Sequence, residues 1–157
     1  MKILILMSII FLTVNVYSQQ DSLDTQTCSN THKKHADLKT IGIYAASIIL
    51  NGIGDGLNNS NHKTAGHVIN ALSIGLLVSS PFLMDYDKKK WYWYLATYTS
   101  LRIGLFDSSY NLTQKLPLRY IGTTSPTDMF YDFLGLDPMI PRPLFLGIGI
   151  VIPLTKL

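Results

Sequence analysis

The sequence predicts a mostly α-helical fold: a small membrane bundle with about three principal apolar helices and a short C-terminal apolar element. Three observations favour this fold class. Only 15% of the 157 residues are charged, whereas soluble domains average about 25%. Long apolar segments follow one another along the chain, and the mean hydropathy is positive at +0.21. Lysines also lie directly beside clustered Trp and Tyr, a pattern typical of the headgroup level of a bilayer.

Residues 1–18 are predicted to form a secretory signal peptide. Lys2 precedes an apolar run from Ile3 to Val16, and the small residue Ser18 provides the expected cleavage position. The apolar run is short for a membrane span, which needs about 20 residues. The alternative is an uncleaved signal anchor. Either interpretation directs the chain through the secretory pathway to the membrane of a bacterial-type cell envelope.

The rest of the chain divides into a leader and one domain. Residues 19–39 are rich in polar side chains and cannot bury enough apolar surface to fold alone, so we expect a flexible leader. Residues 40–157 are expected to form a single helical membrane-associated domain. The one cysteine, Cys28, lies in the leader, which excludes an intramolecular disulfide and a cysteine-rich zinc site.

Two long apolar segments, Ile41–Leu57 and Ala65–Asp85, are separated by a turn rich in Asn and Ser. The second segment is long enough to span a bilayer. The first carries Asn51, Asp55 and Asn58 in its second half, and helical periodicity places them on one side. We therefore expect a polar stripe on an otherwise apolar helix.

The second apolar segment carries its own polar and small residues. His67 and Asn70 lie near its start, about 60° apart on a helix. Gly75, Ser79 and Ser80 are small residues of the kind that line helix contacts in lipid.

A third segment, Tyr86–Phe106, begins with Lys88–Lys90 followed directly by the aromatic run Trp91–Tyr94. Cations beside Trp and Tyr predict an aromatic belt at a membrane surface. The alternative is a buried aromatic cluster in a soluble core. If both preceding segments cross the membrane after a translocated N-terminus, these lysines lie outside, in conflict with the positive-inside rule.

The C-terminal part predicts a short helix and a terminal apolar element. Ser125 is a suitable N-cap, Pro126 fits the first helical position, and Asp128 suits the first turn. We expect this helix to end at Gly135. The terminal run Leu144–Leu154 is short for a helical span, and its β-branched content also allows a strand.

Several kinds of chemistry find no support in the sequence. The chain has no GxSxG elbow, no HExxH helix and no GxxxxGK[ST] phosphate loop. His62 and His67 are five residues apart and match no zinc pattern. The net charge of +3 is small, and it forms no basic stripe that would bind nucleic acid. We therefore predict no metal, no cofactor and no nucleic-acid partner.

The charged residues of the apolar segments define the candidate site. Arg102 and Asp107 are about 140° apart on a helix and cannot face each other, whereas Asp107, Tyr110 and Asn111 share a face. A charge alone in hydrocarbon costs at least ~2.5–3.5 kcal/mol. We therefore expect Arg102 to pair with Asp55 across two helices.

The other members of the expected polar cluster come from all three apolar segments: Asn51, Asn58, His67, Asn70, Asp107, Tyr110 and Asn111. The preferred interpretation is a small envelope membrane protein of unassigned biochemical role, in which this cluster is structural. Its partners would be the lipid bilayer and, as an open alternative, other envelope proteins.

Two further functions stay open. The first is a membrane-embedded enzyme or transporter-like protein that acts on a lipid headgroup or polar envelope intermediate. There Asp55 or Asp107 would act as base, His67 as acid or base, and Arg102 as anchor for a phosphate or carboxylate. The second alternative is a soluble secreted helical protein.

Overall fold

The structure, a computed structural model, describes residues 28–84, 86–122, 126–135 and 137–157. The predicted signal peptide and residues 19–27 of the leader lie outside these ranges. Within them the regular elements are all helical, which confirms the mostly α-helical fold. They are α2 (Cys28–Asn59), α3 (Lys63–Leu83), the 3₁₀ turn η2 (Lys88–Lys90), α4 (Trp91–Thr113), α5 (Pro126–Leu134) and α6 (Pro141–Lys156).

Helix α2 begins much earlier than the first apolar segment predicted. α2 starts at Cys28, so residues 28–39, which we expected to belong to a flexible leader, form its first turns. This stretch contains neither glycine nor proline, so nothing in its backbone interrupts a helix that continues outward from the apolar segment.

Local signals explain the ends of the last two helices. α5 begins at Pro126 and ends before Gly135, as predicted, and this glycine adopts a left-handed φ of 59°. The terminal element is a helix and not a strand. α6 starts at Pro141, because prolines in a first helical turn lack only N–H groups that have no intrahelical partner.

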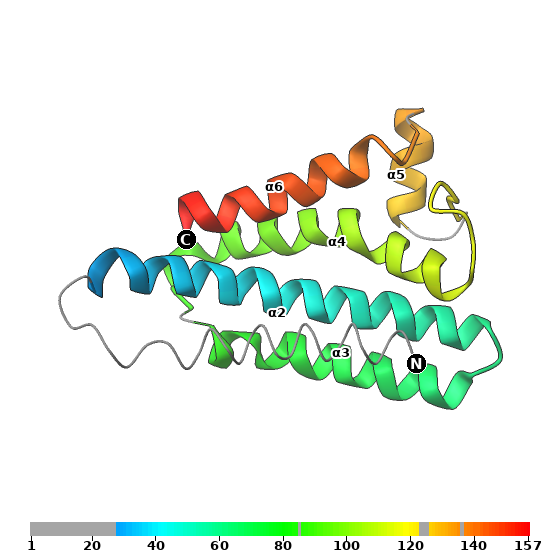
Figure 1. The fold of residues 1–157 in the computed structure, drawn as a ribbon, viewed down its shortest axis with the longest axis horizontal. Helices are drawn as coiled ribbons and strands as arrows, with labels where there is room; N and C mark the ends of the chain where they lie inside the picture. The colour runs from blue at the N-terminus through cyan, green and yellow to red at the C-terminus, as the bar shows by residue number, and fades with distance from the viewer. Residues whose placement is uncertain (1–27, 85, 123–125, 136) are drawn as a thin grey trace.

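The long helices α2, α3, α4 and α6 run along the same axis and alternate in direction (Figure 1). α2 packs against α3 and α4, and α4 packs against α6. The start of α4 and the C-terminus lie at one end of the bundle, and α5 lies at the other. A small core of Tyr44, Ile48 and Leu101 fills the contact between α2 and α4.

Small residues bring the helix backbones close together. A Cβ on Gly66 of α3 would lie 2.6 Å from the carbonyl oxygen of Gly54 in α2. A Cβ on Gly104 of α4 would lie 2.9 Å from the Cβ of Leu146 in α6. Each contact therefore depends on the missing side chain, as in helix pairs packed within lipid. The expected contact residues Gly75 and Ser79 are instead exposed on α3.

Two helical segments, Leu38–Asn59 and Lys63–Leu83, are long and apolar enough to cross a membrane. In the first, half of the most apolar window (50%) is buried inside the bundle, as in a core helix. In the second, only 17% of that window is buried. α3 thus presents most of its apolar surface outward.

Candidate functional site

A polar network joins α2, α3 and α4 near the middle of the bundle. Arg102 Nη1 donates to Asn51 Oδ1 at 3.0 Å. Asn51 Nδ2 donates in turn to Asn70 Oδ1 at 3.3 Å. Asn70 Nδ2 then donates to Asp55 Oδ1 at 2.7 Å. The network therefore links a guanidinium to a carboxylate through two amide side chains.

The expected direct pair between Asp55 and Arg102 does not form in the described part of the chain. Asp55 lies one helical turn beyond Asn51, so Asn51 occupies the level at which the guanidinium reaches α2. Arg102 also stacks on Phe106 of its own helix, with Cζ 4.4 Å from the ring centroid. The two charges remain connected, but only through Asn51 and Asn70.

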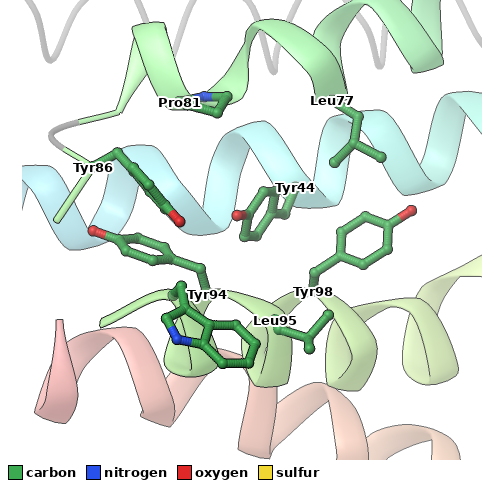
Figure 2. Close-up of a pocket in the computed structure, with 8 residues that line it drawn as sticks. Tyr44, Leu77, Pro81, Tyr86, Tyr94, Leu95 and Tyr98 are labelled. Atoms are coloured by element: carbon green, nitrogen blue, oxygen red, sulfur yellow. The ribbon is translucent and has the colours of Figure 1, made fainter. Parts of the chain in front are cut away.

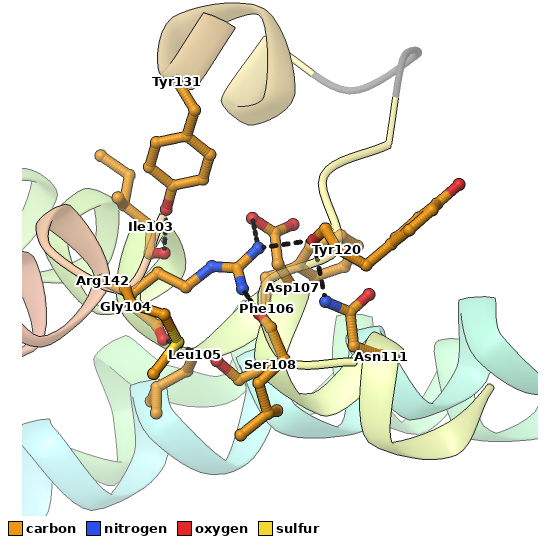
Figure 3. A network of polar contacts seen from close by, with 12 residues as sticks. Ile103, Gly104, Leu105, Phe106, Asp107, Ser108, Asn111, Tyr120, Tyr131 and Arg142 are labelled. Carbon is orange, nitrogen blue, oxygen red and sulfur yellow. Dashed lines mark hydrogen bonds and ion pairs between the residues drawn. The ribbon is translucent and has the colours of Figure 1, made fainter. Parts of the chain in front are cut away.

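A second network lies between α4, α6 and the loop that follows α4 (Figure 3). Arg142 Nη2 of α6 lies 3.3 Å from Asp107 Oδ2 of α4 in a buried ion pair. The same guanidinium donates to the backbone carbonyls of Leu118 and Tyr120, the latter at 3.1 Å. Asn111 Nδ2 donates to the Tyr120 carbonyl at 3.0 Å. These bonds hold the loop against the bundle.

α5 covers this second network. The hydroxyl of Tyr131 donates to the carbonyl of Ile103 at 2.8 Å, and its ring lies 5.5 Å from the Arg142 guanidinium. Burial raises the pKa of the Tyr131 phenol to about 12, although the Arg142 charge acts in the opposite direction. Asp128, in the first turn of α5, is also buried. The short helix therefore shields the ion pair from solvent.

The expected single cluster is thus two separate networks, and some candidates belong to neither. His67 is exposed on α3. Tyr110 accepts a hydrogen bond from Asn59 Nδ2 at 2.8 Å and does not join Asp107 and Asn111. Asn58 is in neither network either: its Oδ1 is buried without a hydrogen-bond partner.

Sequence reasoning missed two features of the site. The first is Arg142, which is buried and is the ion-pair partner of Asp107. Its position two residues before the terminal apolar run was the available signal. The second is a reciprocal contact between α2 and α3: Ser47 Oγ donates to the Ser73 carbonyl at 3.0 Å, and Ser73 Oγ donates to the Ser47 carbonyl at 2.8 Å. Such pairs are typical of closely packed apolar helices.

The chemistry of the two networks is that of paired groups. Asp55 accepts from an amide, and Asp107 pairs with a guanidinium. Among the described residues, no three His, Cys, Asp or Glu side chains converge to hold a metal ion. The arrangement can fix helices relative to one another.

Comparison with protein-family models, curated proteins and solved structures found no match to this chain. The class of protein is therefore inferred from its own fold and contacts. These define an α-helical bundle in which buried and partly buried polar side chains connect the apolar segments of neighbouring helices.

The bridging role of Asn70 gives a first test. Asn70→Ala is expected to lower the free energy of unfolding by about 1–3 kcal/mol, because it removes the hydrogen-bond donor to Asp55 and the acceptor from Asn51. The matched control His67→Ala lies on the same helix but is exposed, and should change stability by less than about 0.5 kcal/mol. Denaturant unfolding in detergent, followed by circular dichroism, measures both. If Asn70→Ala were as stable as His67→Ala, the network would not hold α2 to α3.

Proposed function

We propose that this chain is a small envelope membrane protein, inserted as a helical bundle, in which both polar networks are structural. The observation that carries the proposal is the distribution of side chains on α3. The residues that this helix buries are small: Gly66, Ser73 and Ser80. Its large apolar side chains are exposed instead, and they include Val68, Leu72, Ile74, Val78, Phe82 and Leu83.

This distribution is the reverse of that of a helix in a soluble protein. In water, large apolar residues turn inward, and wide exposed apolar patches mark contacts with a partner or a membrane. In a bilayer, lipid is as apolar as leucine, so large side chains can face outward while small ones let helices approach. Phe82, which is 89% exposed, illustrates how little of this face the bundle covers.

α6 has a similar distribution of side chains. It buries Pro141, Arg142, Gly149 and Pro153 against the bundle. Its exposed side chains include large aliphatic residues, namely Leu144, Ile148, Ile150, Val151 and Leu154. The two outermost helices of the bundle, α3 and α6, therefore both offer apolar surfaces for contact with lipid.

The aromatic residues at the start of α4 support a membrane surface at the end of the bundle where α4 begins. Trp91 and Tyr92 are 58% and 49% exposed and directly follow the lysines of η2. Lys156 at the end of α6 lies 5.7 Å from the ring of Trp93. Exposed Trp and Tyr beside cations suit the headgroup region, where the rings contact both hydrocarbon and water.

The structural role of the networks follows from the cost of polar groups in such a bundle. An unpaired polar group in hydrocarbon is expensive, so paired groups favour one arrangement of the helices over others. A second candidate function, an enzyme that acts on a lipid headgroup, is favoured by one observation. The Asp107–Arg142 pair is buried beside a second buried carboxylate, Asp128, which is an arrangement common in active sites.

A charge placed on the exposed apolar face tests the membrane proposal. Val78→Asp is expected to reduce the carbonate-resistant fraction of the protein in membranes severalfold, because it places a carboxylate in hydrocarbon. Thr64→Asp, at the exposed N-terminal end of the same helix, should leave that fraction unchanged. A soluble protein would tolerate both substitutions. Complete release of the wild-type chain by carbonate, with unchanged behaviour of Val78→Asp, would contradict membrane insertion.

A further inference from the structure

A groove lies between α3 and α4 at the lysine end of the bundle. Both helices pack on α2 but make few contacts with each other, which leaves a space of about 300 Å³ above α2. Figure 2 shows Tyr44 of α2 between the two helices, with Leu77 and Pro81 on one side and Leu95 and Tyr98 on the other. The groove is open to the surroundings of the bundle along its length, since Pro81 and Leu95 are exposed.

The walls of the groove are mostly apolar, and aromatic side chains make up much of them. Tyr44 and Tyr98 meet edge to face, with ring centroids 5.5 Å apart. Tyr86 and Tyr94 lie 4.8 Å apart. Aromatic side chains have few rotamers, and these contacts restrict them further, so the groove is largely preformed. Its shape suits a narrow, flexible apolar ligand.

The mouth of the groove carries positive charge. Lys88 and Lys89 are exposed and lie between two lining residues, Tyr86 and Trp91. The neighbouring Asp87 carboxylate accepts a hydrogen bond from the backbone N–H of Lys89 at 2.9 Å. Because this segment joins Tyr86 to Trp91, its two exposed lysines lie at the end of the groove that these two residues line. An anionic group attached to an apolar chain complements this arrangement.

We propose that the groove holds one acyl chain of an anionic phospholipid, whose phosphate is contacted by Lys88 and Lys89. The inference rests on the proposed membrane function, because two residues that line the groove, Pro81 and Leu95, are exposed on the surface that would face lipid. The occupant is a specific lipid, distinct from the surrounding lipid that covers the rest of α3. Its site is defined jointly by the apolar walls and the two lysines.

Tryptophan quenching by brominated lipid tests this site on the full-length chain. The Trp93→Phe variant leaves Trp91, which lines the groove. It is reconstituted in phosphatidylcholine vesicles containing increasing fractions of phosphatidylglycerol or phosphatidylcholine brominated on the acyl chains. We expect brominated phosphatidylglycerol to half-quench Trp91 at a severalfold lower mole fraction than brominated phosphatidylcholine. Trp91→Phe leaves Trp93 outside the groove and should show no such preference.

Charge variants separate the possible outcomes. Lys88→Gln with Lys89→Gln should abolish the preference for phosphatidylglycerol, whereas Lys63→Gln at the opposite end should preserve it. Equal quenching of Trp91 by both lipids, at their bulk fractions, would overturn the lipid site while leaving membrane insertion intact. Absence of quenching of either tryptophan by either lipid would overturn insertion and the site together.

Discussion

Arg142→Ala is expected to destabilise the bundle by about 3–5 kcal/mol, because it leaves a buried carboxylate without its cation. Asp107 and Arg142 are only 6% and 4% exposed. The substitution also removes the donors to the carbonyls of Leu118 and Tyr120, so the loop after α4 loses its attachment. Denaturant unfolding in detergent, followed by circular dichroism, measures the loss. The exposed pair Arg119–Asp137 supplies the control: Arg119→Ala should cost at most about 1 kcal/mol.

The double substitution Asp107→Leu with Arg142→Met distinguishes a pairwise interaction from two independent ones. If the ion pair is the source of the lost stability, the double variant loses less stability than the summed losses of Asp107→Leu and Arg142→Met measured separately. The reason is that neither charge remains buried alone in the double variant. Strictly additive losses would show that the two residues stabilise the bundle separately. A coupling of about 0.5–3 kcal/mol is expected for groups in direct contact.

The same double variant separates the two candidate functions. A structural role requires only that the helices stay together. A stable double variant should therefore complement a deletion strain and return it to the wild-type phenotype. A catalytic role requires the carboxylate or the guanidinium itself. A variant that accumulates normally but fails to complement the deletion would therefore favour the enzyme over the structural interpretation.

The sequence predicted helices more successfully than it predicted contacts between them. The signals at Pro126, Asp128 and Gly135 placed α5 correctly, and the spacing of Arg102 and Asp107 correctly excluded a pair within α4. The partner of Arg102 could not be predicted in the same way. Whether it meets Asn51 or Asp55, one turn apart, depends on how far α4 slides along α2, and a single sequence does not encode that offset visibly.

Arg142 was missed because its partner is 35 residues away and its own segment is rich in proline. Only when Pro141 and Pro143 are accommodated in the first turn of a helix does the guanidinium reach α4. The exposure of His67 has a similar origin. The face of α3 that packs against α2 is formed by small residues at every seventh position, Gly66, Ser73 and Ser80. His67 lies about 100° around the helix from Gly66 and is therefore outside this face.

The second large effect is expected at Gly66, where the backbones of α3 and α2 lie close together. In Gly66→Ala, the new Cβ would lie 2.6 Å from the Gly54 carbonyl oxygen and would also meet the Asn58 amide. A backbone atom cannot move aside without separating the helices, so we expect a loss of about 1–3 kcal/mol. We expect this net loss of stability even though alanine in place of glycine stabilises a helix interior by up to about 1 kcal/mol.

Gly75→Ala isolates the effect of the contact, because it makes the same chemical change on the same helix. A Cβ at Gly75 meets no atom within 4 Å, so only the helix propensity changes and this variant should be slightly more stable. Opposite signs for the two variants in denaturant unfolding would establish that the missing side chain at Gly66 sets the distance between α2 and α3. If both variants were stabilised, the close approach would be wrong, and with it the placement of Asn70 that joins Asp55 to Asn51.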